Sequence, residues 1–167
     1  MIKSNTKELV GIKEIDELCN FEIAKLSDIS ISLRVMLRNR ADKLLDVYMA
    51  KHRALSEEAV LLGHDPSYLQ FFVVFHKNVL ELRWGVRTGR TSFATKNITK
   101  FLKKDAKYGY SKTTLSKVSK SWDRSLVLET EDQLRDIRKA SAQLTEVKRS
   151  KLKLQNSFQK ILEVESA

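Results

Sequence analysis

The residues of this sequence best suited to chemistry are the cations between positions 83 and 124. This stretch, the cationic segment, holds twelve Lys and Arg residues against two carboxylates, Asp105 and Asp123, and its charge of +10 equals that of the whole chain. Aromatic and hydroxyl side chains are interleaved with the cations. Because cations neutralise phosphates and the other side chains offer stacking and hydrogen bonds, this combination predicts a nucleic-acid surface.

Different residue types within the cationic segment suit different contacts. Arginine can pair bidentately with guanine, so the arginines are the candidates for reading bases. The lysines suit phosphates, and the hydroxyl groups, including that of Thr114, suit polar contacts to the backbone. For Arg83 and Arg87, plain solvation is an equally weighted alternative. The predicted binding residues are Arg83, Arg87, Arg90, Lys96, Lys100, Lys103, Lys104, Lys107, Tyr108, Tyr110, Ser111, Lys112, Thr113, Lys117 and Lys120.

Composition limits the fold that presents these residues. A chain of 167 residues with five glycines and a single proline favours long regular elements, and so a helix-rich fold. The lone cysteine, Cys19, rules out an internal disulfide and fits a reducing compartment. No window approaches the roughly 20 apolar residues of a membrane span. We therefore expect a soluble cytoplasmic protein without membrane contact.

The first third of the chain has helical periodicity. Apolar residues recur at spacings of three and four over residues 5–26 and again over 29–62. Ser27 and Asp28 favour helix N-caps, so we expect a break between the two helices there. Gly63 and Pro66 should end the second helix. Its length suggests a coiled-coil or antiparallel partner.

The middle of the chain predicts an antiparallel β-meander. Residues 68–76 are aromatic and β-branched, and residues 79–88 alternate apolar and polar around a turn at Lys77-Asn78. A third short strand is expected at residues 91–94. Trp84 has apolar neighbours in register, which favours core packing over stacking on a base.

Two short basic helices are expected after the meander. Residues 97–107 place Ile98, Phe101 and Leu102 among lysines, and Ser111 is a good N-cap for a helix over 112–122. The pair resembles a helix-turn-helix only in outline, because the connection is looser than usual.

The C-terminal part predicts a second long helix. Residues 125–130 read as a short buried segment, and Thr130 to Gln133 resemble a capping box that would begin a helix reaching nearly to the C-terminus. The fold class is therefore α+β, mostly α: long antiparallel N- and C-terminal helices with the meander and the basic helices between them. The domains predicted are a helical region at 1–66, a nucleic-acid-binding head at 67–124 and a returning helix at 125–167.

Catalytic patterns are missing from the sequence. His52, His64 and His76 have no metal-ligand spacing with one another or with Cys19, and no phosphate-cradling glycine loop or nucleophile elbow is present. We expect a protein that is not an enzyme, with no cofactor and no metal.

Three stretches resemble the MobI family of conjugative-transfer proteins. They are LELRW at 80–84, KYGYSK at 107–112 and, above all, SWDRSLVLETEDQLRDIRK at 121–139. The resemblance spans residues 68–137. It implies an auxiliary factor of integrative conjugative elements or conjugative plasmids that binds double-stranded DNA at the origin of transfer and helps the relaxase begin DNA processing, as part of the relaxosome.

Other functions stay open at this stage. A helical interaction module could present its basic end to an acidic protein, and charge alone does not separate DNA from RNA. A nuclease or relaxase subunit with a dispersed active site is a further alternative. A homodimer through the long helices is a hypothesis, because many origin-binding proteins read repeats as pairs.

Overall fold

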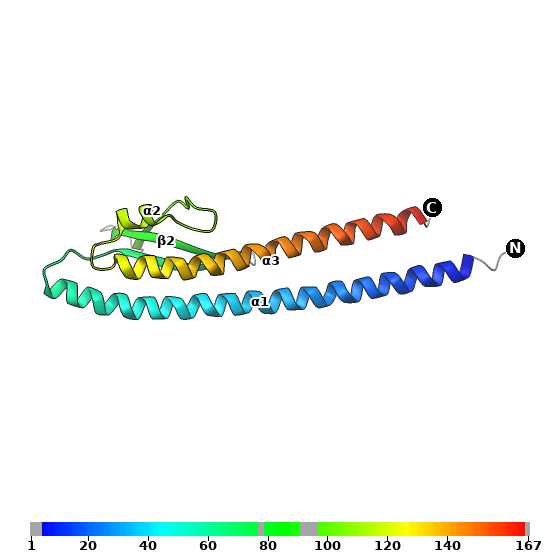
Figure 1. Ribbon diagram of the computed structural model, residues 1–167, viewed down its shortest axis with the longest axis horizontal. Helices are drawn as coiled ribbons and strands as arrows, with labels where there is room; N and C mark the ends of the chain where they lie inside the picture. Colours follow the sequence, from blue (N-terminus) through cyan, green and yellow to red (C-terminus); the bar gives the residue numbers. More distant parts are fainter. Residues whose placement is uncertain (1–4, 77–78, 91–96, 166–167) are drawn as a thin grey trace. The chain divides into compact units, whose positions relative to one another are not determined.

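The computed structural model describes residues 5–76, 79–90 and 97–165, which form three helices and a three-stranded antiparallel sheet. The helices are α1 (Asn5–Leu61), α2 (Lys112–Val118) and α3 (Arg124–Glu165), and the strands are β1 (Leu69–His76), β2 (Val79–Arg90) and β3 (Asn97–Phe101), as Figure 1 shows. The predicted fold class, α+β and mostly α, is confirmed.

The chain divides into two compact units. Unit 1 consists of residues 1–35 and 142–167, and unit 2 consists of residues 36–141. Each unit contains part of α1 and part of α3, running in opposite directions within that unit (Figure 1). The sheet, α2 and the whole cationic segment belong to unit 2.

Helix α1 is continuous, so the predicted break at Ser27-Asp28 is wrong. The Ser27 hydroxyl lies 2.6 Å from the Nζ of Lys151, from which it accepts a hydrogen bond. Packing against α3 therefore overrides the local capping preference of serine. The predicted end of the helix is confirmed, because Gly63 has a φ of 75° and the amides of Gly63 and His64 donate back to the carbonyls of Val60 and Ala59.

The predicted meander is confirmed as a sheet of order β1-β2-β3. The register pairs Leu69 with Val86, Phe71 with Trp84 and Val73 with Leu82, so these residues share one side of the sheet. The predicted turn at positions 77–78 and the predicted third strand at 91–94 lie outside the described residues.

The predicted helix over residues 97–107 is wrong. Residues 97–101 form β3 instead and pair with β2, with Thr99 opposite Arg87 and Phe101 opposite Gly85. Strand β2 reaches Arg90, beyond its predicted end, and offers β3 a long edge. Main-chain hydrogen bonding to that edge stabilises the strand more than the local helical spacing of the lysines favours a helix.

The two remaining helices differ in length from the predictions. Ser111 caps α2 as expected, but α2 ends at Val118. Helix α3 already begins at Arg124, so Thr130 is not its cap. Instead, the Thr130 hydroxyl donates to the carbonyl of Leu126 inside the helix. Burial of Val127 and Leu134 explains why the helix continues through the capping-box sequence.

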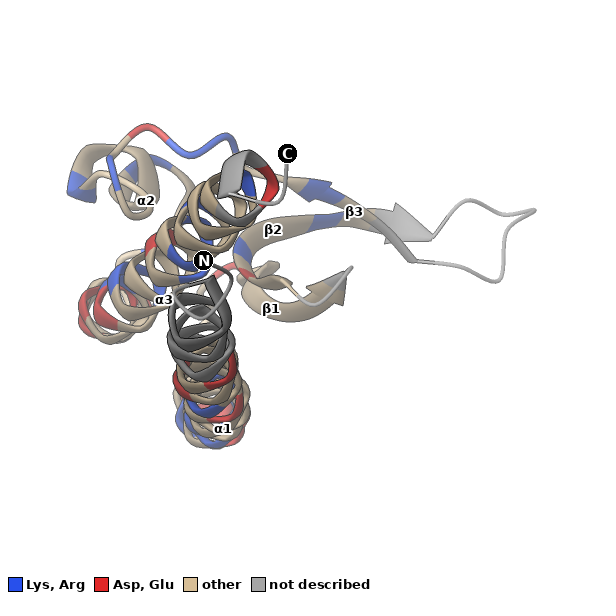
Figure 2. Ribbon diagram, turned by 90° about the vertical axis from the view of Figure 1, so that its right-hand side faces the viewer, with Lys and Arg blue, Asp and Glu red and all other residues tan. Residues whose placement is uncertain are grey.

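Aromatic side chains form the centre of the unit 2 core. Tyr48, Phe71 and Trp84 are almost fully buried, with ring centroids 5.3 to 5.5 Å apart. The Tyr48 hydroxyl donates to the carbonyl of Leu69, which satisfies its one polar group. The predicted core position of Trp84 is therefore confirmed. In unit 2, α1 and α3 cover the same side of the sheet (Figure 2).

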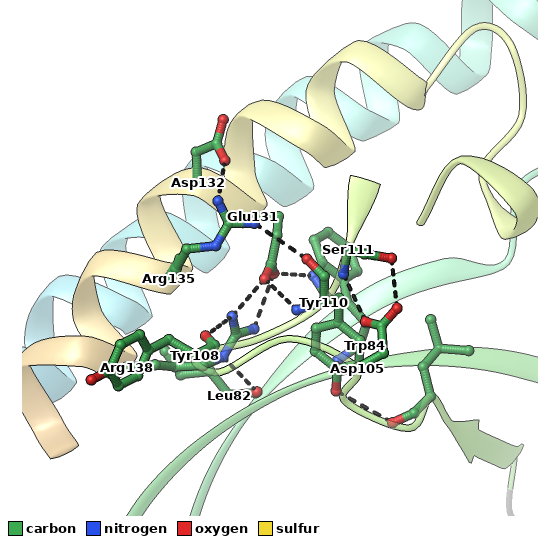
Figure 3. A network of polar contacts seen from close by, with 11 residues as sticks. Leu82, Trp84, Asp105, Tyr108, Tyr110, Ser111, Glu131, Asp132, Arg135 and Arg138 are labelled. Atoms are coloured by element: carbon green, nitrogen blue, oxygen red, sulfur yellow. Dashed lines mark hydrogen bonds and ion pairs between the residues drawn. The ribbon is translucent and has the colours of Figure 1, made fainter. Parts of the chain in front are cut away.

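A buried ion pair joins α3 to the sheet, as Figure 3 shows. The Arg138 guanidinium donates to both carboxylate oxygens of Glu131, at 2.8 and 3.1 Å, and its Nε donates to the carbonyl of Leu82. Glu131 also accepts from the indole N–H of Trp84 at 2.8 Å and from the amide of Tyr110 at 2.9 Å. We call these residues the Glu131 network.

Gly109 packs directly against the Glu131 network. A Cβ atom at this position would collide with the carboxylate of Glu131 and the guanidinium of Arg138. The carbonyl of Tyr108 accepts a hydrogen bond from Arg138 at 3.1 Å. The connection before α2 therefore lies close on the ion pair, and only glycine leaves room for that approach.

Breaking the Glu131 network from either side should destabilise unit 2. Glu131→Gln or Arg138→Met should each lower the free energy of unfolding by about 3–5 kcal/mol, because each leaves a buried group unpaired. The double variant should lose less than the sum of the two. Urea unfolding followed by tryptophan fluorescence measures this, since both tryptophans lie in unit 2.

The exposed residue Asp132, which pairs with Arg135 on the same helix and within unit 2, is the matched control. Asp132→Asn should cost less than about 1 kcal/mol, because exposed ion pairs contribute little. Equal losses at Glu131 and Asp132, or strictly additive losses at Glu131 and Arg138, would contradict this assignment.

Candidate nucleic-acid interface

Strands β2 and β3 present the first group of predicted binding residues. Arg87 and Lys100 are exposed. Arg83 is partly exposed, pairs with the carboxylate of Glu81 and lies 5.6 Å from the ring centroid of Phe101. Arg83 is therefore held in place by a carboxylate and an aromatic ring, while Arg87 and Lys100 extend from the sheet into solvent.

The connection after β3 presents the second group. Lys103, Lys104 and Lys107 are exposed, and the Nζ of Lys107 lies 5.3 Å from the ring centroid of Tyr108. Desolvation, followed by the positive charge of Arg138, lowers the pKa of Lys104 below its usual value. Three exposed lysines thus lie within five residues of this connection, where a bound anion would favour their charged forms.

Helix α2 and the residues after it present the third group. Lys112, Thr113 and Lys117 are exposed, whereas Lys120 pairs with Asp65 at 3.2 Å. The start of the helix is held by Asp105. This carboxylate accepts from the Ser111 amide at 2.7 Å, and from the hydroxyls of Ser111 and Thr114 at 2.5 and 2.7 Å. Ser111 is consequently a capping residue whose hydroxyl is already engaged.

The two tyrosines of the KYGYSK stretch have different environments. Tyr108 is partly exposed, whereas Tyr110 has no exposed surface. The Tyr110 hydroxyl accepts from the amide of Trp84 at 3.3 Å and donates to the carbonyl of Leu102 at 3.4 Å. Burial raises the pKa of Tyr110, so the hydroxyl remains a donor. The interpretation of Tyr110 as a nucleic-acid contact is therefore corrected: this residue belongs to the core.

Most of the described cations of this surface are unpaired. Figure 2 shows Lys and Arg on α2, on the connection after β3 and on β2 and β3. Within the described part of the segment, Arg83 and Lys120 are the cations with a carboxylate within 4.0 Å. The side chain of Arg90 and all of Lys96 lie outside the described residues. Unit 2 therefore carries a surface of exposed cations on adjacent elements.

A family model supports the resemblance seen in the sequence. The MobI protein family matches residues 37–151, which is more than half of the chain and includes all of the cationic segment. The chain belongs to the MobI family. Family membership relates it to mobilisation in conjugative transfer. No match was found among curated proteins or among solved structures.

The MobI match nearly coincides with unit 2. Residues 37–151 contain the sheet, α2, the Glu131 network and the exposed cations.

No helix in the described ranges is long and apolar enough to cross a membrane.

Sequence reasoning missed the second face of the sheet in this MobI chain. Phe72 and Phe101 lie on the side opposite the core, with ring centroids 5.4 Å apart. The predicted helix over residues 97–107 does not allow Phe101 to pair with Gly85 of β2, so this face of the sheet was not expected. The alternation of Thr99 and Phe101 with lysine at 100 is a strand signal, but five residues are too few to outweigh the helical spacing.

A second feature missed from the sequence is a buried polar cluster between α1 and the start of α3 in unit 2. His52 Nε2 lies 3.6 Å from the buried Asp123 carboxylate, and neither group has a hydrogen-bond partner. Ser119 Oγ is also buried without one. No group of three or more His, Cys, Asp or Glu residues within the described ranges is arranged to hold a metal.

Asp105 should give the α2 cap a characteristic acid sensitivity. Hydrogen bonds from the hydroxyls of Ser111 and Thr114 lower its pKa from 3.8 to about 2. The folded state therefore binds this proton less readily than the unfolded chain, so the stabilisation is complete above pH 3.8 and is lost as pH falls towards 2. The carboxyl carbon shift of Asp105, followed by NMR, should titrate near pH 2.

Asp105→Asn should remove that acid-dependent contribution and loosen the start of α2, measured as faster amide exchange at Thr114. Asp136→Asn removes the same charge from an exposed position of α3 and is the control. An Asp105 carboxyl that titrates at its ordinary value would contradict the hydrogen-bonded cap.

Proposed function

We propose that this MobI-family protein binds double-stranded DNA at an origin of transfer and assists the relaxase as a relaxosome component. The observation that supports the proposal most directly is the set of exposed, unpaired cations on β2, β3, the following connection and α2. Residues of unit 2 carry a net charge of +9, against +1 for unit 1. Such a concentration attracts a phosphate backbone before any specific contact forms.

The positions of the cations suggest a division of roles. Lys103, Lys107, Lys112 and Lys117 are exposed point charges that suit phosphates. Arg87 projects from a rigid strand, a placement that suits the bidentate geometry of base recognition. Lysines that bind phosphates fix the position of the protein along the duplex, and this position decides which base edge an arginine contacts. Specific recognition of an origin therefore needs both the lysines and the arginine.

We propose that the protein acts by binding and not by catalysis, in the cytoplasm where the DNA and the relaxase meet. The relaxase would perform the chemistry, and this chain would supply the DNA contacts that place it. A homodimer is the stoichiometry that we propose, with unit 1 as the interface.

The apolar surface of unit 1 supports the homodimer. Its large apolar side chains are 38 to 62% exposed, an unusual amount for a surface that faces water. Its near-zero charge does not oppose association of two copies. These exposed residues are Leu18, Phe21, Leu26, Ile29, Ile31, Leu33, Val35, Val147, Leu152, Leu154, Phe158 and Ile161.

Removing Arg83 and Arg87 should weaken DNA binding and relax its sequence preference. The double variant Arg83→Ala/Arg87→Ala should bind an origin-of-transfer duplex about tenfold to a hundredfold more weakly, because a bidentate arginine contributes about 1–3 kcal/mol. Fluorescence anisotropy measures the affinity at several salt concentrations. The wild-type log–log slope should approach about −0.9 per phosphate neutralised.

Arg40→Ala/Arg53→Ala removes the same charge from exposed positions of α1 and serves as the control. It should leave affinity and preference nearly unchanged. An equal loss in both variants would mean that only net charge matters. Tighter binding to RNA than to duplex DNA, or no binding to any duplex below micromolar concentrations, would reject the proposal.

The homodimer is tested by charging the apolar face of unit 1. Leu18 and Ile29 are eleven residues apart, close to three helical turns, and share one face of α1. Sedimentation should show the wild-type protein as a dimer and Leu18→Asp/Ile29→Asp as a monomer with unchanged helix content. Met49→Asp/Val60→Asp makes the same two changes at the same spacing on exposed apolar positions of α1 in unit 2, and this variant should remain dimeric. A monomeric wild-type protein at tens of micromolar would reject this interface.

A further inference from the structure

The side of the sheet that faces away from α1 and α3 has the composition of a binding platform. Register places Phe72, Arg83 and Gly85 on this side, together with Thr99 and Phe101 from β3. We call this surface the open face. Phe72 and Phe101 are not part of the buried core cluster, and no helix in the described part of unit 2 covers the open face (Figure 2).

Gly85 leaves space on the open face that side chains of the two neighbouring strands occupy. A Cβ atom on Gly85 would lie 2.7 Å from Thr99 Cγ2, and 3.1 and 3.2 Å from the rings of Phe72 and Phe101. The absence of a side chain at the centre of the sheet therefore brings three side chains of two other strands together. The two rings meet edge-to-face at 81°, which fixes their orientation.

Phe101 remains accessible within this arrangement. The residue is 43% exposed although its ring contacts Phe72 and has a guanidinium 5.6 Å from its centroid. An aromatic ring on a strand is rigid, because the backbone is held by the ladder and the side chain by its neighbours. Such a ring can accept another planar group against its exposed surface.

Cations surround the exposed ring. Arg83 lies beside Phe101, and Arg87 pairs in register with Thr99 on the same side of the sheet. Desolvation lowers the pKa of Lys104, and the positive charges of Arg138 and Arg83 lower it further, so Lys104 also lies near these cations. Glu81 offsets one of these charges through its pair with Arg83. The net charge around the ring is still positive. A ligand of this site should therefore have a planar aromatic group that stacks on the ring and a negative charge close to that group.

We propose that the open face binds single-stranded DNA, with an unpaired base stacked on Phe101 and adjacent phosphates held by Arg83 and Arg87. Bases in a duplex stack on one another and cannot offer a free surface, so this contact selects unpaired nucleotides. The inference rests on the proposed function and extends it: Arg83 and Arg87, which meet base edges in the duplex, would hold phosphates of the strand once it is opened, and the stacking contact on Phe101 is specific to the unpaired strand.

Fluorescence anisotropy with a labelled oligo-dT of about twelve nucleotides tests the proposal with the full-length protein. Phe101→Ala should weaken binding of oligo-dT roughly 5- to 100-fold, the range for loss of one stacked base. Binding of the origin duplex should change less than twofold, because Arg83 keeps its ion pair with Glu81 when the ring is removed. Phe101→Tyr, which retains a ring, should bind oligo-dT like the wild type, whereas Phe101→Leu should not.

Phe75→Ala is the matched control. Phe75 is also 43% exposed and belongs to the same sheet, but it pairs with Leu80 on the side that faces the helices. This variant should keep the wild-type affinity for oligo-dT. Circular dichroism and tryptophan fluorescence establish that each variant retains its fold, and the leucine variant separates loss of the ring from loss of apolar packing.

The outcomes distinguish this inference from the proposed function. Wild-type binding to duplex but not to oligo-dT would overturn the single-strand site alone, as would equal losses in the alanine variants of Phe101 and Phe75. A parallel loss of duplex and single-strand binding in Phe101→Ala would also overturn it. Preference for oligo-U over oligo-dT would assign the site to RNA, and failure to bind any DNA would reject both proposals.

Discussion

The buried carboxylate of Glu131 is tolerable only because four hydrogen bonds surround it. Two come from Arg138, one from the indole of Trp84 and one from the amide of Tyr110. Removing a charge from water costs several kcal/mol unless such partners are supplied. The donors come from α3, from β2 and from the connection before α2, so satisfying this one anion fixes three elements of unit 2 relative to one another.

This arrangement explains how a small three-stranded sheet can present charged side chains. Trp84 and Tyr110 are held inside, with their polar atoms occupied by Glu131, by the backbone of β2 and by Leu102. The alternation of strands then directs Arg83 and Arg87 to the opposite side. Asp105, a rare acid among these cations, accepts hydrogen bonds from Ser111, the N-cap of α2, and from Thr114, and among the described residues it forms no ion pair with the neighbouring lysines.

The sequence pattern correctly predicted the elements whose conformation is determined by local residues. The β1–β2 pair, the end of α1 at Gly63 and the capping role of Ser111 follow from alternation and turn chemistry, and the structure confirms them. The family was also recognised, and its match covers the three stretches that carry the resemblance. Charge counting drew attention to the segment, although it could not separate the partly exposed Tyr108 from the buried Tyr110.

The errors arose where distant partners decide the conformation. Residues 97–101 have a helical spacing of lysines but form a strand, because the edge of β2 is available. Ser27 and Thr130 have capping chemistry, yet each lies within a helix. Ser27 accepts a hydrogen bond from Lys151, 124 residues away, and Thr130 is buried. The open face was missed for the same reason: Phe72 and Phe101 meet only once β3 has paired with β2.

The close contact of Gly109 with Glu131 and Arg138 has a consequence for how this family can diverge. A side chain at position 109 is incompatible with the ion pair, while loss of the ion pair would leave a space beside the backbone. The three positions should therefore vary together: relatives that retain the acid and the base should retain glycine, and those that admit alanine or serine should have replaced the pair with apolar residues. Replacing the ion pair and the glycine would need several simultaneous substitutions. Positions 109, 131 and 138 should therefore change slowly in this family.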